Sequence, residues 1–200
     1  MAETERNRVL NLAREAGMIR VREVRAQGLH PEHLRRLLAD GLIERIARGV
    51  YVPADVERTP DHSLAQVAKK IPHGVICLLS ALRYHNVGTQ SPFEVWVAVD
   101  RRARKPSLEA PKLRVVRYSG DALTAGVERH QIEGVDVQVY SVAKTVADCF
   151  KYRNKIGLDV ALEALREGLR GQRFTRDELA ARAKECRVKN VLQPYLEWVS

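Results

Sequence analysis

The sequence predicts an α+β protein: an N-terminal winged helix-turn-helix followed by a larger α/β domain with a small sheet and a helical C-terminal tail. Three observations support this class. The first fifty residues follow the order helix, short strand, helix, helix and hairpin. Residues 93–142 contain runs of strand composition, and the chain after them has apolar residues at helical spacing. We therefore expect two domains, residues 1–56 and residues 57–200.

The first helices are predicted from apolar spacing and from the residues that end them. Apolar residues recur at helical spacing from Val9 to Ala16, and Gly17 marks the end of this helix. A brief apolar run at 18–20 and a short helix over 21–27 follow. The pattern indicates two helices separated by one short extended segment.

A third helix is expected to begin at Pro31, because a proline in the first turn lacks only an N–H that would be unpaired there. We expect it to bury Leu34, Leu37 and Leu38 and to end at residues 40–41.

Two short strands come next, residues 42–46 and 50–52, around a turn that contains Gly49. Two helices joined by a short turn and then a hairpin form the order of a winged helix-turn-helix, so the third helix is the candidate for the DNA major groove.

The solvent side of that third helix carries Glu32, His33, Arg35 and Arg36. Arginine is the commonest side chain to contact guanine edges, and arginines on the hairpin and the preceding elements could contact phosphates. The alternative is a solvated face, since residues 20–48 hold seven basic residues against four acids. The predicted DNA-binding residues are Arg20, Arg22, Arg25, His33, Arg35, Arg36, Arg45 and Arg48.

The second domain is predicted to mix helices with a small sheet. Strands are expected over 93–99, 113–118 and 135–142, where β-branched and aromatic residues are frequent. Helices are expected at 59–72, 80–85, 143–152, 156–170, 175–186 and 188–199. The helix after Thr175 begins with a capping box that Glu178 completes.

The chain is basic, with 34 Lys and Arg against 25 Asp and Glu, a formal charge of +9. Such a surface attracts polyanions, and double-stranded DNA is the expected partner. Residues 1–60 contribute only +2, from eleven basic residues and nine acids, so most of the excess lies outside the winged helix. No run of apolar residues is long enough to span a membrane, and the N-terminus does not resemble a secretory signal, so we expect a cytoplasmic protein without a membrane partner.

A second basic cluster follows the strand that ends near residue 100. Residues 101–117 hold seven basic residues and one acid, Glu109. The two interpretations are a solvated loop and a second polyanion contact, either with DNA flanking the site or with an acidic or RNA-bound partner. The candidate residues are Arg101, Arg102, Arg104, Lys105, Lys112 and Arg114.

Lys144, Thr145 and Asp148 form a third cluster at a strand-to-helix junction. Lys144 and Asp148 are four residues apart and share a helix face, while Val146 and Phe150 are expected to face inward. The pair could be structural, or it could bind a partner or act in catalysis.

No sequence motif indicates an enzyme, a cofactor or a metal site. Phosphate-binding loops, zinc-protease and serine-hydrolase motifs are absent, and Glu109 and Lys112 have the wrong spacing for a nuclease. His30 and His33 have no third metal ligand nearby. The three cysteines are far apart, as in a reducing compartment: Cys77, Cys149 and Cys186.

Beyond these patterns, the chain resembles the AbiEi family, the antitoxins of type IV toxin–antitoxin systems. The likeness covers nearly the whole length and includes Arg48-Gly49-Val50-Tyr51 and the segment 80–85. The run from Tyr140 to Leu169, which contains Lys-Thr-Val-Ala-Asp-Cys-Phe, is the most specific part.

The resemblance implies a repressor that binds inverted repeats in its own promoter through the winged helix. It also implies that the C-terminal domain counteracts a nucleotidyltransferase toxin without forming a stable complex, and that Lys144, Thr145 and Asp148 serve this antitoxin function. Two alternatives stay open: a stand-alone winged-helix regulator, and a DNA-tethered enzyme or sensor whose second domain is catalytic.

Overall fold

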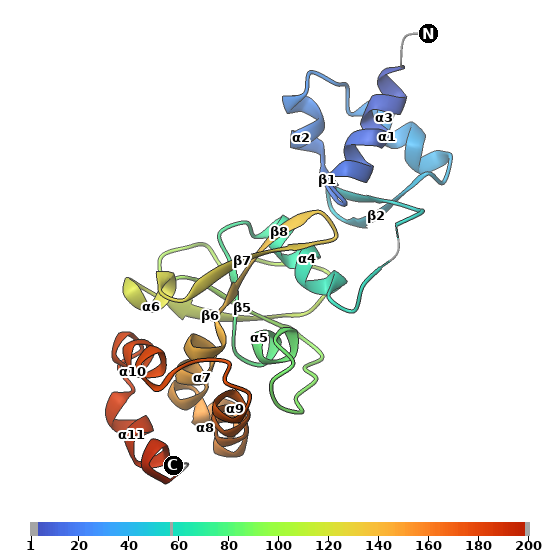
Figure 1. Cartoon of the computed structure of the whole chain (residues 1–200). Coiled ribbons are helices and arrows are strands. Elements are labelled where there is room, and N and C mark those ends of the chain that lie inside the picture. Colours follow the sequence, from blue (N-terminus) through green and yellow to red (C-terminus); the bar gives the residue numbers. More distant parts are fainter. Residues whose placement is uncertain (1–3, 57, 199–200) are drawn as a thin grey trace. The chain divides into compact units, whose positions relative to one another are not determined.

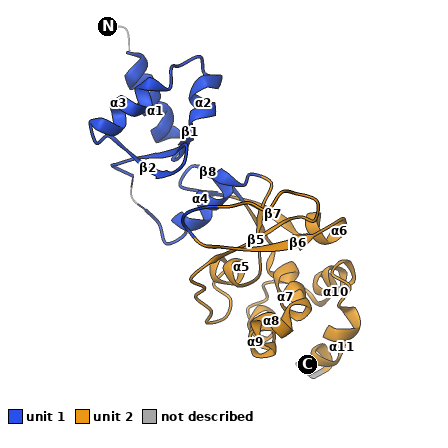
Figure 2. Ribbon diagram, turned by 180° about the vertical axis from the view of Figure 1, so that it is seen from behind, with its two compact units in different colours: residues 1–72, 108–111, 131–137 blue, residues 73–107, 112–130, 138–200 orange. Residues whose placement is uncertain are grey.

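The computed structural model describes residues 4–56 and 58–198 (Figure 1). The chain forms two compact units, and Figure 2 colours them separately. Unit 1 comprises Met1–Pro72, Leu108–Pro111 and Gln131–Val137. Unit 2 comprises His73–Ser107, Lys112–His130 and Gln138–Ser200.

The N-terminal part of unit 1 is a winged helix-turn-helix, which confirms the predicted fold class. Its three strands pair antiparallel in the order β1-β3-β2. Its elements are α1 (Glu5–Glu15), β1 (Ile19–Arg20), α2 (Val21–Ala26), α3 (Glu32–Ala39), β2 (Ile43–Ala47) and β3 (Val50–Pro53).

Local chemistry explains where these helices begin and end. The Thr4 side chain accepts a hydrogen bond from the Asn7 N–H, 3.3 Å away, at the start of α1. Beyond its end, Gly17 adopts a φ of 62°, a conformation that glycine takes without steric cost. Leu34 and Leu37 of α3 are buried, but Leu38 is 38% exposed, so the prediction that it is buried is wrong. Leu38 lies about 100° around the helix from Leu37, at the edge of the apolar stripe.

Unit 1 continues beyond the winged helix with α4 (His62–Lys70) and the turn Glu133–Gly134. The Glu133 carboxylate accepts hydrogen bonds from the Thr59 N–H at 2.7 Å and the Thr59 hydroxyl at 2.9 Å, and lies 2.6 Å from His62 Nδ1. A Cβ at Gly17 would lie 1.5 Å from the Glu133 carbonyl oxygen. This turn therefore packs directly on the end of α1. A functional division at residue 56 stays a prediction.

A five-stranded mixed sheet, in the order β6-β5-β4-β8-β7, is the second sheet. β4 pairs antiparallel with β5 and parallel with β8, and β5 pairs parallel with β6. The strands are β4 (Val75–Ile76), β5 (Val95–Asp100), β6 (Leu113–Tyr118), β7 (Val127–Ile132) and β8 (Val135–Tyr140). The sequence did not predict β7, which is an edge strand with mostly polar side chains.

Helices of unit 2 gather on one side of this sheet (Figure 1). They are α5 (Leu78–Tyr84), α7 (Val142–Lys151), α8 (Arg153–Ile156), α9 (Leu158–Arg170), α10 (Arg176–Glu185) and α11 (Lys189–Trp198). The short helix α6 (Asp121–Thr124) follows β6 at the end of the sheet. The capping box predicted for Thr175 and Glu178 forms at the start of α10. α7 is the central helix, because it packs against α5, α9 and α10. None of the helices in the described parts of the chain is long and apolar enough to cross a membrane.

Candidate nucleic-acid interface

The helix-turn-helix is built from α2, α3 and the turn between them. Gly28 adopts a φ of 72° in this turn, and Leu29 is buried beside Val24 and Leu34. These contacts fix α3 to the body of unit 1 through one face. The opposite face is left to the solvent.

That exposed face carries Arg35 and Arg36, which share one acidic neighbour, Glu32. Arg35 donates hydrogen bonds to both Glu32 carboxylate oxygens, at 2.6–3.0 Å, and Arg36 Nε lies 3.9 Å from the same carboxylate. The hydrogen bond from Arg35 lowers the pKa of Glu32, and the same bond raises the pKa of Arg35. Glu32 therefore neutralises part of the positive charge that the face presents.

Two of the predicted DNA-binding residues are engaged within unit 1. The Arg20 guanidinium donates to the Lys69 carbonyl at 2.9 Å, and burial lowers the pKa of Arg20. The His33 side chain is 17% exposed and its Nε2 lies 3.0 Å from the Glu5 carboxylate. Sequence spacing gives no sign of either contact, because both partners lie far away along the chain.

The wing is the β2–β3 hairpin. The extra residue between Arg45 and Ala47 makes a β-bulge, and Gly49 in the turn has a φ of 73°. Arg45 and Arg48 are exposed. Lys70 Nζ donates to the Arg48 carbonyl at 2.9 Å, a wing contact that was not predicted from the sequence. The two lysines that end α4 were its only signal.

Arg22 and Arg25 on α2 are exposed as well. The structure therefore leaves six of the eight predicted residues open to solvent within one unit: Arg22, Arg25, Arg35, Arg36, Arg45 and Arg48.

The second basic cluster lies in unit 2. Arg101, Arg102 and Arg104 are exposed in the loop that follows β5. Arg117 on β6 donates to the carbonyl of Asp100, the last residue of β5, at 2.9 Å, and to the carbonyl of Ala103 in the loop. These bonds hold the loop backbone, while the arginines of the loop itself stay exposed.

Its remaining members differ in their surroundings. Lys105 and Lys112 are exposed. Arg114 forms an ion pair with Glu94 at 2.6 Å and lies 5.5 Å from the ring of Trp96. Arg114 therefore contributes less positive charge than the loop arginines.

Lys144, Thr145 and Asp148 are fully buried in α7, so the expectation that the pair lies opposite an inward apolar face is wrong. The structure does bring the three residues together. Lys144 Nζ lies 2.5 Å from the Asp148 carboxylate and 4.1 Å from the centre of the Tyr140 ring. Thr145 donates to the Tyr140 carbonyl at 3.3 Å.

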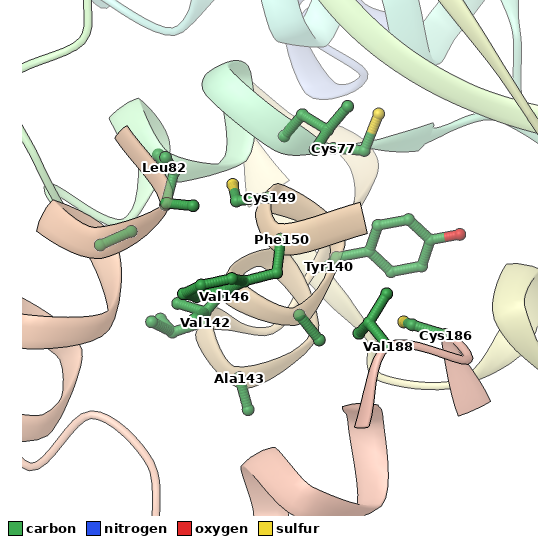
Figure 3. Close-up of a cluster of buried hydrophobic side chains, with 14 of the residues drawn as sticks. Cys77, Leu82, Tyr140, Val142, Ala143, Val146, Cys149, Phe150, Cys186 and Val188 are labelled. Atoms are coloured by element: carbon green, nitrogen blue, oxygen red, sulfur yellow. The ribbon is translucent and has the colours of Figure 1, made fainter. Parts of the chain in front are cut away.

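The surroundings of Asp148 are those of a core. Burial raises the pKa of Asp148, and the neighbouring Lys144 opposes this shift without cancelling it. Cys186 Sγ donates to Asp148 at 3.2 Å, and burial raises the pKa of the Cys186 thiol to about 12. Figure 3 shows Cys149, Phe150 and Cys186 within this apolar cluster. A substrate could not reach Lys144 or Asp148 in this structure.

Among the described residues there is no group of three His, Cys, Asp or Glu side chains that could hold a metal ion. All three cysteines are unpaired and buried.

Comparisons with known proteins agree with the fold and, for the N-terminal segment, with the family. Residues 7–54 match a family described as "Transcriptional regulator, AbiEi antitoxin", which confirms the resemblance over that segment. The run from Tyr140 to Leu169 lies outside the matched residues. No curated protein matches the chain. The crystal structure of RV2827C protein from Mycobacterium tuberculosis is similar, with a TM-score of 0.61, 13% sequence identity, and coverage of 98% of this chain and 82% of that chain.

Proposed function

We propose that this chain, an AbiEi-type transcriptional regulator over residues 7–54, represses its own operon and is the antitoxin of a type IV toxin–antitoxin system. The family match supports the regulatory role. Binding to an operator in its own promoter and counteraction of a toxin are the steps that we propose beyond the family match.

For DNA binding, the supporting observation is the exposed arginine face of α3 in a winged helix-turn-helix. We assign Arg35 and Arg36 to base edges in the major groove, and Arg48 at the wing turn to the neighbouring backbone. Arg22 and Arg25 of α2 are assigned to phosphates. Arg20 and His33 are assigned to holding the domain together, because both already bind groups within unit 1.

Residues 101–105 are assigned a second, sequence-independent contact with DNA that flanks the operator. The exposed loop arginines suit phosphate groups, which contribute affinity without specificity. Inverted repeats in promoter DNA would give such contacts on both sides of the site.

For the antitoxin role, we assign residues 57–200 to counteracting a nucleotidyltransferase toxin without a stable complex. Support for this step is the resemblance of the sequence. Lys144, Thr145 and Asp148 would serve it through the fold of unit 2, since none of them is exposed.

The test uses the full chain, because α4 and the Glu133 turn belong to the same unit as the winged helix. The double variant Arg36→Ala/Arg48→Ala should abolish repression of a promoter reporter and still rescue cells from the toxin of the same operon. Arg14→Ala is the matched control, since Arg14 pairs with Asp55 at 2.8 Å and lies outside α3 and the wing. Loss of rescue together with repression, in a variant that folds, would contradict the division of roles.

A stand-alone regulator is the second candidate. It is favoured by the family match, which covers the regulatory segment and not the rest of the chain. In that case the wild-type chain would repress the reporter but give no rescue from the toxin.

A further inference from the structure

A basic cleft in unit 2 is not used by the proposed DNA contacts. It has a volume of about 740 Å³ and lies where the ends of β6, α7 and α10 meet. Four cationic side chains line it: Arg117, Lys151, Lys184 and Arg187. Such a volume lies within the range of small-molecule sites, which span about 300–1,000 Å³.

The acids of the cleft leave most of this positive charge uncompensated. Asp121 and Glu185 are the acidic residues that line it. Glu185 already forms an ion pair with Arg182 at 2.9 Å. Within residues 4–56 and 58–198, no acid forms an ion pair with Lys151, Lys184 or Arg187.

Two of the cations are held in place by groups that do not neutralise them. The Arg117 guanidinium is fixed by backbone carbonyls, which are uncharged acceptors. Lys151 Nζ lies 5.2 Å from the centre of the Tyr118 ring, which forms a buried part of the cleft wall. Both charges are therefore positioned before any ligand arrives, which lowers the entropic cost of binding.

The backbone at Arg187 also bears on the cleft. This residue follows the end of α10 with a φ of 59°, a left-handed conformation in which glycine is the usual residue. The Val188 N–H donates to the Ala183 carbonyl at 2.8 Å, as in a Schellman motif. An arginine at this position is less favourable for the backbone than glycine would be, and it adds a cation to the lining of the cleft.

We propose that this cleft binds the oligophosphate group of a small molecule. Four cations that line one cleft suit a ligand with several negative charges, and the concave shape suits a compact ligand better than a duplex. The wall has few apolar side chains, so the phosphate oxygens supply the recognition.

The test is isothermal titration of the full chain with sodium tripolyphosphate at constant ionic strength. We expect saturable binding with one site per chain. Lys184→Gln/Arg187→Gly should weaken it at least tenfold. Arg187→Gly suits the left-handed backbone, so the variant is expected to keep the thermal midpoint of the wild type. Arg170→Gln, an exposed change on α9 outside the cleft, is the matched control and should bind as the wild type does.

A second titration uses ATP, to establish whether a nucleoside adds to the affinity of the phosphates. Absence of saturable binding to both probes would overturn the proposal. So would equal weakening in the Arg170→Gln control, which would indicate only a general effect of charge. If the double variant instead weakens binding to every DNA duplex and tripolyphosphate does not bind, the cleft is a DNA contact and the small-molecule proposal is wrong.

Discussion

Glu32 reduces the positive charge on the exposed face of α3, because it accepts hydrogen bonds from Arg35 and lies near Arg36. Glu32→Gln should release both arginines for phosphates and bases. We expect severalfold tighter binding to any duplex, and a steeper salt dependence by about 0.9 in the logarithmic slope for each additional phosphate that the protein binds. Binding titrations at several salt concentrations measure both quantities.

The matched control is Asp40→Asn. It removes the same charge, but Asp40 pairs with Arg6 of α1. If the two variants bind DNA equally well, the Glu32 contact has no special role in setting the charge on the exposed face of α3.

Asp148 is the residue at which a structural role is tested against a chemical one. Removing its carboxylate would leave Lys144 buried without its ionic partner. Asp148→Ala should therefore lower the free energy of unfolding by about 3–5 kcal/mol, measured by urea denaturation. The double change Lys144→Met/Asp148→Leu should recover much of that loss, because it removes both charges. An Asp148→Ala chain that is as stable as the wild type but no longer rescues cells from the toxin would contradict the structural role.

For single residues, the sequence predicted which polar side chains pair when they are close along the chain. It did not predict whether such a pair is buried. Lys144 and Asp148 were expected to pair, and they do. Their burial depends on α9, α10 and α5, which surround α7 and are distant in sequence. Arg20 shows the same limit, since its acceptor is the Lys69 carbonyl.

The turn between β7 and β8 connects to the start of α4 within unit 1 through the side chain of Glu133. Glu133 has a φ of 51° and Gly134 a φ of 74° in this two-residue turn. The Glu133 side chain is 4% exposed and binds Thr59 and His62. These contacts attach the turn to the start of α4.

This turn makes stability depend on pH. Burial alone would raise the pKa of Glu133, but hydrogen bonds from His62 and Thr59 outweigh it and lower the pKa below its ordinary value of 4.5. The folded state thus keeps the carboxylate ionised at a pH where the unfolded chain takes up a proton. Its contribution to stability is complete above pH 4.5 and is lost as the pH falls through the folded-state pKa.

Glu133→Gln should remove this contribution, at a cost of about 1.5–3 kcal/mol near neutral pH, since the variant has no hydrogen bonds to a charged group at this position. The difference in unfolding free energy between wild type and variant should shrink as the pH falls below about 4.5. Urea denaturation at a series of pH values measures it. A difference that is constant down to the lowest pH would contradict this role of the ionised carboxylate.

The sequence predicted most elements because their apolar periodicity is strong. The winged helix and strand β6 were predicted with boundaries within a few residues. β7 was missed because an edge strand has less need of an alternating apolar face. Helix α5 was placed two residues late, because Leu78 belongs to an apolar run that also fits a strand.

At the scale of the whole molecule, the positive charge outside the winged helix requires an explanation. Part of this charge lies on the loop arginines of unit 2, which are exposed and whose backbone is held by Arg117. Contact between these arginines and DNA phosphates would explain that part. Replacing Arg101, Arg102 and Arg104 by Ala should weaken binding to all DNA sequences alike. The slope of the logarithm of the binding constant against the logarithm of the salt concentration should become shallower by about 0.9 for each phosphate that the variant no longer binds.

Arg114→Ala is the control for this triple variant. Because Arg114 is already paired with Glu94, its removal should change the slope little. An unchanged slope in the triple variant would exclude the loop as a DNA contact.

We propose that α3 gives this chain sequence-specific DNA binding. The most direct measurement is a gel-shift titration of the full chain on its own upstream DNA, at two salt concentrations and against scrambled competitor DNA. We predict specific binding that Arg36→Ala weakens by about 1–3 kcal/mol on the operator, while binding to scrambled DNA changes much less. Weak, salt-sensitive binding that is equal on both DNAs, or a specific complex that Arg36→Ala leaves unchanged, would contradict the account.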